Sequence, residues 1–253
     1  MHKGMGRDRL DPPALDPGLA LFLDVDGTLL EIAAAPDLVQ VPAGLPDLLG
    51  RRAAERNGAL ALISGRPLTQ LDDLFRPWCG AAAGLHGVER RRANGSIAPS
   101  TAGTGAISRI RPTLSGLADS GSGLVFEDKG ASLALHYRRA PEREAEILAF
   151  AERLHRDAVA DLRLIKGKMV VELVPAHADK GGAIDAFLAE PPFLGHRPVF
   201  IGDDATDEDG FAAVNRRGGL AVRVGQPDEE TVAPYCLPSV AAVLAWLGAG
   251  GNL

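Results

Sequence analysis

A chain of 253 residues with 46% hydrophobic residues is long enough for one large domain, or for a core with a smaller second domain. Its formal charge of -6 disfavours a nucleic-acid partner or an anionic membrane surface, because both require basic protein surface. Two cysteines, Cys79 and Cys236, are too few for a disulfide framework, so we expect reduced thiols in a cytoplasmic protein.

The first segment, residues 1–18, is polar and contains Pro12, Pro13 and Pro17. It lacks the apolar stretch of a secretory signal, and we expect a flexible leader. No apolar run elsewhere reaches the length of a membrane span, so we expect no membrane association.

The first predicted strand is the apolar run Leu19–Leu23, which is followed at once by Asp24, Asp26 and Gly27. In open α/β sheets, ligands bind at the carboxyl ends of strands. Two carboxylates placed there are costly unless a cation joins them, and Mg²⁺ with a phosphate is one solution. The alternative is an ordinary turn, since Asp and Gly are common turn residues.

A second strand and a helix follow. Leu60–Ile63 predicts another buried strand, and Ser64 opens a polar loop after it. Pro67 suits the first turn of a helix whose apolar residues recur at helical spacing. Strand, loop and helix in this order indicate the βα unit of a parallel sheet. Residues 80–87 predict a third strand.

The middle of the chain has a different character. Residues 93–105 are small and polar, which favours a linker. Two hairpins are predicted, at residues 124–137 and 162–174, with an amphipathic helix at 141–156 between them. We therefore expect an inserted α+β domain at 105–177, within a core formed by 19–104 and 178–253.

The parallel pattern then resumes. Lys180 opens a helix, and a strand at Val199–Ile201 leads into Asp203, Asp204 and Asp207. A further strand at 220–224 and a closing helix near 240–247 complete the predicted core. The fold class is thus α/β, a doubly wound parallel sheet of the Rossmann type with an inserted cap.

Parallel strands bring their carboxyl ends to one edge of a sheet, so the acids, the hydroxyl of Ser64 and the ammonium of Lys180 can converge. Oxygen ligands with one hydroxyl and one ammonium suit Mg²⁺ and a phosphoryl group. Each of these candidate residues also has a purely structural interpretation. Ser64 could cap a helix, Lys180 could be solvated, and the acids from Asp204 onward could form an acidic first helical turn.

The ordered set resembles phosphatases of the haloacid dehalogenase (HAD) superfamily, which carry a DxDGT loop, a Ser/Thr, a Lys and a GDD-type acidic loop in this order. The resemblance implies Asp24 as the nucleophile, which forms an aspartyl phosphate, and Asp26 as the general acid and base. It implies Mg²⁺ as the cofactor, held by Asp24, the carbonyl of Asp26 and Asp203, with support from Asp207 and Asp204.

The same resemblance assigns the phosphoryl oxygens to Ser64 and Lys180, together with the loop residues Gly65 and Arg66. Arg66 could face the phosphate or the solvent.

A narrower resemblance, from about Leu21 to Val224, is to trehalose-6-phosphate phosphatases. It is carried by Gly84–Gly87, Glu127-x-Lys129, His136–Arg138, Glu172, Asp179–Gly181 and Gly202–Glu208. In that family, cap residues matching Glu127, Lys129 and Glu172 bind sugar hydroxyls. Glu127 and Lys129 have the same parity, so they share a face if the strand extends that far.

Two alternatives stay open for this group. Lys129 and Glu172 could form a cross-strand salt bridge, a role compatible with sugar binding. His86 could line the pocket or merely be a loop histidine whose hydrogen bonds are satisfied.

The resemblance implies a Mg²⁺-dependent trehalose-6-phosphate phosphatase with a small-molecule sugar phosphate as its partner, and we expect a monomer. Its cap is expected to close on hinges before Ile107 and at Pro175–Ala178. The alternatives are a related sugar phosphatase for sucrose phosphate or mannosylglycerate phosphate, a non-catalytic regulatory domain of trehalose synthesis, and a phosphotransferase of the mutase type.

Overall fold

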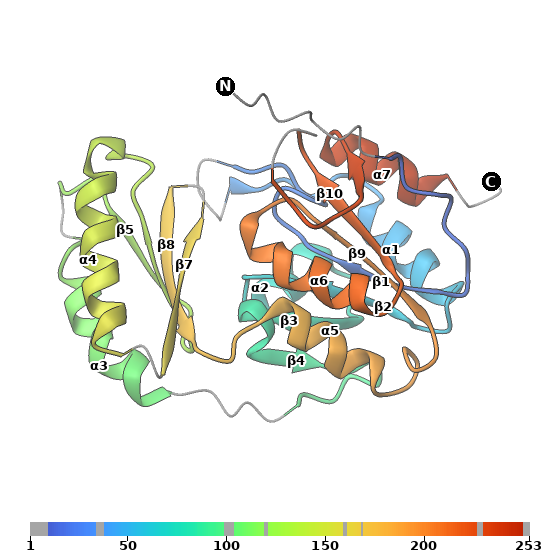
Figure 1. Cartoon of the computed structure of the whole chain (residues 1–253), viewed down its shortest axis with the longest axis horizontal. Coiled ribbons are helices and arrows are strands. Elements are labelled where there is room, and N and C mark those ends of the chain that lie inside the picture. The colour runs from blue at the N-terminus through green and yellow to red at the C-terminus, as the bar shows by residue number, and fades with distance from the viewer. Residues whose placement is uncertain are drawn as a thin grey trace, which may run out of the picture.

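The computed structural model describes residues 10–33, 38–98, 104–118, 121–158, 161–167, 169–226 and 230–249. The chain forms two units side by side, one built on a seven-stranded sheet and one on a four-stranded sheet (Figure 1). No helix among these residues has both the length and the apolar character that crossing a membrane requires.

The seven-stranded sheet has the order β11-β10-β9-β1-β2-β3-β4, and all its strand pairs are parallel except β3–β4. Its strands are β1 (Leu19–Leu23), β2 (Leu60–Ile63), β3 (Ala81–Gly84), β4 (Glu89–Arg91), β9 (Arg197–Gly202), β10 (Leu220–Val224) and β11 (Tyr235–Leu237). The strand order reverses at β1, which lies between β2 and β9, as the doubly wound prediction requires.

Helices cover both faces of this sheet (Figure 1). They are α1 (Leu45–Ala54), α2 (Leu68–Phe75) and α7 (Val240–Gly248) on one face, and α5 (Lys180–Leu188) and α6 (Glu208–Arg216) on the other. Successive side chains of a strand point to opposite faces, so Leu21 packs with the first group and Phe22 with the second. A strand buried on both faces reads as a continuous apolar run, and this is why β1 was predictable.

The second sheet is antiparallel, in the order β5-β6-β8-β7. Its strands are β5 (Val125–Asp128), β6 (Leu133–His136), β7 (Leu162–Gly167) and β8 (Val170–Pro175), so both predicted hairpins are confirmed. The helices α3 (Thr104–Ser115) and α4 (Glu144–Arg156) pack on one face through Ile107 and Ile147. The other face turns toward the larger unit (Figure 1).

Several predicted boundaries differ from the structure. The strand expected at 80–87 ends at Gly84, and a short 3-10 turn at Leu85–Gly87 follows it. The edge strands β4 and β11 are not among the predicted elements, because three residues are too few to establish an alternating pattern.

The expected leader is partly held against the core. The N–H of Leu10 donates to the carbonyl of Pro234, and the indole of Trp246 donates to the carbonyl of Pro13. Residues 1–9 of the expected leader and 99–103 of the expected linker lie outside the described residues.

Candidate active site

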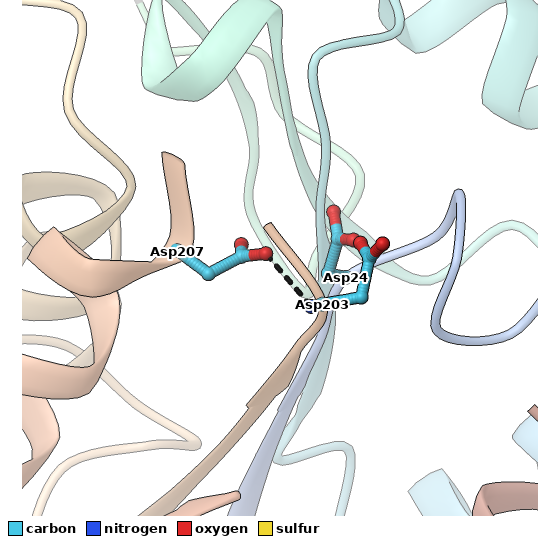
Figure 2. Close-up of side chains that lie close together, drawn as sticks. All are labelled: Asp24, Asp203 and Asp207. Atoms are coloured by element: carbon cyan, nitrogen blue, oxygen red, sulfur yellow. Dashed lines mark hydrogen bonds between the residues drawn. The ribbon is translucent and has the colours of Figure 1, made fainter. Parts of the chain in front are cut away.

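Two acids lie at the ends of neighbouring central strands. Asp24 follows β1 and Asp203 follows β9, and the parallel register pairs Leu23 with Ile201. Carboxylate oxygens of Asp24, Asp203 and Asp207 lie within 4.8 Å of one another, and all three residues are buried. Figure 2 shows the carboxylates of Asp24 and Asp203 next to each other, with Asp207 approaching Asp203 from the other side. The predicted convergence of residues 24 and 203 is therefore present.

Asp207 supports this loop from behind. Its Oδ2 accepts hydrogen bonds from the backbone N–H groups of Asp203 (3.0 Å) and Asp204 (2.9 Å). The first of these is the dashed line in Figure 2. The Asp204 carboxylate instead caps a short 3-10 turn by accepting from the N–H of Ala205. Asp207 thus fixes the backbone that presents Asp203.

Lys180 connects these acids as the first residue of α5. Its Nζ lies 2.7 Å from Asp24 Oδ1 and 2.6 Å from Asp207 Oδ1. Lys180 is only 3% exposed, so the solvated-lysine alternative is wrong. Burial lowers the pKa of Lys180, but Asp207 and Asp24 outweigh it and leave that pKa above its ordinary value.

The cluster carries excess negative charge. Burial, then Asp207 and Asp203, raise the pKa of Asp24 well above its ordinary range, against the lowering by Lys180. Lys180 contacts two of the three buried carboxylates, Asp24 and Asp207, and a hard divalent cation with oxygen ligands would balance the charge of the cluster. The donor set therefore fits Mg²⁺.

The loop after β2 holds the second acid of the first motif. Arg66 Nε lies 2.7 Å from Asp26 Oδ2, and Arg66 Nη2 lies 2.7 Å from Asp26 Oδ1. Arg66 is buried, so the solvent-facing alternative is wrong. Ser64 does not cap α2, because Pro67 occupies the N-cap position; its Oγ accepts from the N–H of Arg66 at 3.1 Å.

Glu172 is the centre of a buried polar network that the smaller sheet contributes. It lies opposite Ala134 in the β6–β8 ladder, and its carboxylate meets Lys129 Nζ (3.1 Å), Ser132 Oγ (2.7 Å) and His86 Nε2 (3.4 Å). Burial raises the pKa of Glu172, but Lys129, His86 and Ser132 outweigh it and leave that pKa far below its usual range. The predicted salt bridge between Lys129 and Glu172 is present, but it is not a cross-strand pair, because β5 ends at Asp128 and does not neighbour β8.

This network crosses from one unit to the other. Lys129 Nζ also donates to the carbonyl of Gly65 at 3.3 Å, which lies next to Ser64 in the larger unit. His86 has a left-handed backbone (φ 55°), and its ring packs so closely that a Cβ on Gly65 would lie 2.7 Å from Nε2. His86 lines the cavity between the two units, and its Nδ1 is buried without a hydrogen-bond partner among the described residues, so it is not simply a satisfied loop histidine.

The parity argument for Glu127 and Lys129 does not apply, because its condition that the strand extends to Lys129 is not met. β5 ends at Asp128, so Lys129 lies beyond the strand, and Glu127 contacts His136 Nε2 at 2.9 Å. Burial raises the pKa of Glu127, while His136 and Lys129 lower it, and the net result is a lowered pKa.

Two further lining residues, His136 and Arg138, were part of the resemblance but were not predicted as site residues. The signal for His136 was available: it pairs with Val125 across the hairpin, on the same face as Glu127.

A cavity of about 190 Å³ lies between the two units and brings the predicted residues together. Every predicted site residue except Asp207 lines it: Asp24, Asp26, Ser64, Gly65, Arg66, His86, Glu127, Lys129, Glu172, Lys180 and Asp203. One end thus offers carboxylates, an ammonium and a hydroxyl, which suit a phosphoryl group, and the other offers carboxylates and an ammonium that suit hydroxyl groups.

Comparisons with known proteins agree with this arrangement. A family model described as trehalose-phosphatase matches residues 22–240. A protein named "probable trehalose-phosphate phosphatase" from Sinorhizobium fredii is 45% identical over 240 residues, covering 94% of this chain and 90% of its own length. The trehalose-6-phosphate phosphatase of Escherichia coli is 42% identical over 237 residues, covering 94% and 88%. The C-terminal domain of Candida albicans trehalose-6-phosphate phosphatase has the same fold, with a TM-score of 0.81, 21% identity and coverage of 95% of this chain and 98% of that one.

Proposed function

The chain belongs to the trehalose-phosphatase family, and on that premise we propose that it hydrolyses trehalose 6-phosphate to trehalose and phosphate through an aspartyl-phosphate intermediate. One observation carries the proposal. The strand-end pair Asp24 and Asp203 lines the same cavity as the buried Glu172 network, so a phosphoryl group and sugar hydroxyls can be bound at once.

Asp24 is the proposed nucleophile. A carboxylate oxygen of Asp24 attacks phosphorus, and the bond from phosphorus to the sugar oxygen breaks. Lys180 orients this carboxylate through its 2.7 Å contact with Oδ1, and Thr28 Oγ1 donates to Oδ2 at 3.3 Å. With one donor on each oxygen, the nucleophile keeps a single orientation toward the cavity.

Asp26 is the proposed general acid and base. It gives a proton to the departing sugar oxygen, then accepts one from the water that attacks the aspartyl phosphate, which releases phosphate and restores Asp24. The two hydrogen bonds from Arg66 fix the position of the Asp26 carboxylate. Arg66 therefore places Asp26 relative to the loop of Ser64 and Gly65, which we expect to bind phosphoryl oxygens.

Asp24, the backbone carbonyl of Asp26 and Asp203 would hold Mg²⁺. When bound, the ion neutralises charge on the phosphoryl group and on the attacking carboxylate. Asp207 keeps Asp203 in place through the backbone, and Lys180 neutralises part of the remaining negative charge.

The sugar is bound by the smaller unit, which we propose acts as a cap domain at residues 105–177 on a core of 19–104 and 178–253. Glu127, Lys129 and Glu172 accept from and donate to sugar hydroxyls, and His86 completes the wall. The contact from Lys129 to the Gly65 carbonyl links sugar recognition to the phosphate loop, and closure of the cap would exclude water. We propose a monomer acting in the cytoplasm, and a light-scattering mass of two chains would contradict the first part.

The alternatives make different predictions. A related sugar phosphatase would prefer sucrose 6-phosphate or mannosylglycerate phosphate, a regulatory domain would release no phosphate, and a mutase would require a sugar bisphosphate. The regulatory alternative is disfavoured because Asp24, Asp26, Lys180 and Asp203 are all present and assembled.

The test is phosphate release from a panel of sugar phosphates by the purified protein. We expect trehalose 6-phosphate to have the highest kcat/KM. Asp24→Asn should reduce kcat by at least about a thousandfold, whereas Asp47→Asn, which changes an exposed acid of α1, should leave it unchanged. Equal turnover by wild type and Asp24→Asn excludes Asp24 as the nucleophile.

A further inference from the structure

A second cavity, of about 490 Å³, adjoins the one that holds the reactive groups. The two share five lining residues: Val39, Arg66, Gln70, Glu127 and His136. The second cavity lies between α2 of the core and β5 of the smaller sheet, and its lining contains neither Asp24 nor Asp203. It therefore extends the site away from the phosphoryl end.

The size of the first cavity makes this extension significant. At about 190 Å³ it is smaller than the roughly 300–1,000 Å³ of sites that enclose a small organic ligand. It has room for a phosphoryl group and part of a sugar, and a substrate with two hexose rings needs more. The adjoining 490 Å³ supplies that room in the direction set by Glu127 and His136.

The lining of the second cavity is amphipathic. Leu74 of α2 and Val125 of β5 provide apolar surface, and Val125 is 43% exposed although it is a large apolar residue. Gln70 and Asp73 of α2 provide polar groups. A hexose has the matching character, because its C–H groups pack on apolar side chains while its hydroxyls need hydrogen-bond partners.

Gln70 is oriented for this task by a residue already in the site. Arg66 Nη1 donates to Gln70 Oε1 at 3.3 Å. A guanidinium has only donors, so the amide oxygen faces Arg66 and the amide NH₂ remains available as a donor to a hydroxyl. Because Arg66 also holds Asp26, the second cavity and the general acid are joined through one side chain.

We propose that this second cavity is the subsite for the unphosphorylated ring, and that α2 and β5 set the preference for a disaccharide phosphate over a monosaccharide phosphate. The proposal rests on the proposed function. It adds Gln70, Asp73, Leu74 and Val125, which contact the substrate away from the reacting atoms, as the residues that determine specificity.

The first test fills the cavity. Val125→Phe should lower kcat/KM for trehalose 6-phosphate about tenfold or more, while kcat/KM or Ki for glucose 6-phosphate changes less than about twofold. Inorganic phosphate as an inhibitor reports on the phosphoryl end, and its Ki should not change. The matched control is Val232→Phe, since Val232 is 55% exposed and lines neither cavity.

The second test uses an ion pair. Asp73 Oδ1 accepts from Arg76 Nη2 at 2.8 Å, with both side chains largely exposed, so neither is needed for folding. Asp73→Ala and Arg76→Ala break the same pair, but only Asp73 lines the cavity. We expect Asp73→Ala alone to lower kcat/KM for trehalose 6-phosphate, by about threefold to tenfold, with glucose 6-phosphate unaffected.

The outcomes separate the two proposals. If wild type does not hydrolyse trehalose 6-phosphate, the proposed function fails. If wild type does, but Val125→Phe affects both sugar phosphates equally or neither, the subsite is excluded. If circular dichroism shows that Val125→Phe does not fold, the comparison of Asp73→Ala with Arg76→Ala is the test. Equal values of kcat/KM for trehalose 6-phosphate in these two variants overturn the inference.

Discussion

Arg66 and Asp26 form a two-point ion pair, with Nε to Oδ2 and Nη2 to Oδ1 both at 2.7 Å. Such a paired geometry fixes the plane of the carboxylate as well as its position. Arg66 lies in the loop after β2, and Asp26 lies in the loop after β1. The ion pair therefore connects the ends of two neighbouring strands. We infer that Asp26, the proposed general acid, is positioned by the loop that we propose binds the phosphate.

Arg66→Lys is the first prediction. Lysine keeps the charge but cannot make two parallel hydrogen bonds, so Asp26 loses its fixed orientation. We expect kcat for trehalose 6-phosphate to fall about 10-fold to 100-fold, and to fall by more than KM rises. Arg91→Lys is the control, because Arg91 is also buried and contacts both oxygens of Asp72. An unchanged kcat in Arg66→Lys contradicts the positioning role.

The second prediction concerns Gly27. Its φ is +81°, and a Cβ there would lie 2.1 Å from Asp203 Oδ2. Gly44 has the same φ, but a Cβ at Gly44 would have no neighbouring atom within 4 Å. Both Gly→Ala changes introduce about 1–2 kcal/mol of backbone strain, but only Gly27→Ala displaces Asp203. We expect a loss of Tm in both variants, larger in Gly27→Ala, and a loss of activity of about 100-fold or more in Gly27→Ala alone. Equal activities in the two variants would argue against a role for Asp203 at this edge.

The third prediction concerns the charge of Glu172. Its folded-state pKa is depressed, so its ionised form stabilises the protein above the unfolded-state pKa of about 4.3, and this contribution is lost as the pH falls toward the folded-state pKa. Glu172→Gln should lower the free energy of unfolding by about 3 kcal/mol at pH 7, and the difference should shrink below about pH 4.3.

Urea unfolding at a series of pH values measures this difference. Glu152→Gln, which breaks the exposed pair with Lys166, should leave stability nearly unchanged. A Glu172→Gln difference that stays constant from pH 7 to about pH 3.5 would rule out the ionised network as its source.

The fourth prediction is metal dependence. Removal of divalent cations with EDTA should abolish phosphate release, and added Mg²⁺ should restore it. Mg²⁺ should also stabilise the folded protein, by about 2.7 kcal/mol when its concentration is 100 times the Kd. The measurement is the rise in Tm when Mg²⁺ is added. Asp203→Asn should show no such rise, and Asp47→Asn should show the same rise as wild type. An equal shift in both variants would place the cation elsewhere.

The catalytic edge was predictable because local sequence determines it. An apolar run followed by acids predicts a buried strand that ends at the site, and parallel strands share that edge, so Asp24 and Asp203 had to approach each other. The hairpins of the smaller sheet could also be predicted from the sequence, because residues typical of turns separate their strands.

Side-chain partners depended on distant packing and were less predictable. The sequence could not distinguish Asp204 from Asp207, because only the backbone hydrogen bonds of the folded loop show which one supports Asp203. The pairing of Glu127 with His136 depended on where β5 ends. Gln70 lies in an amphipathic helix with no local sign that its outer face meets another unit.

The position of β1 at the centre of the large sheet affects how the chain is made. Its neighbour β9 begins at Arg197, so synthesis must pass residue 197 before β1 acquires its second partner. Until then this wholly apolar strand has an open edge, which is prone to pairing with other chains. A nascent chain stopped before residue 197 should therefore aggregate or engage a chaperone, whereas release after β10 should relieve this dependence.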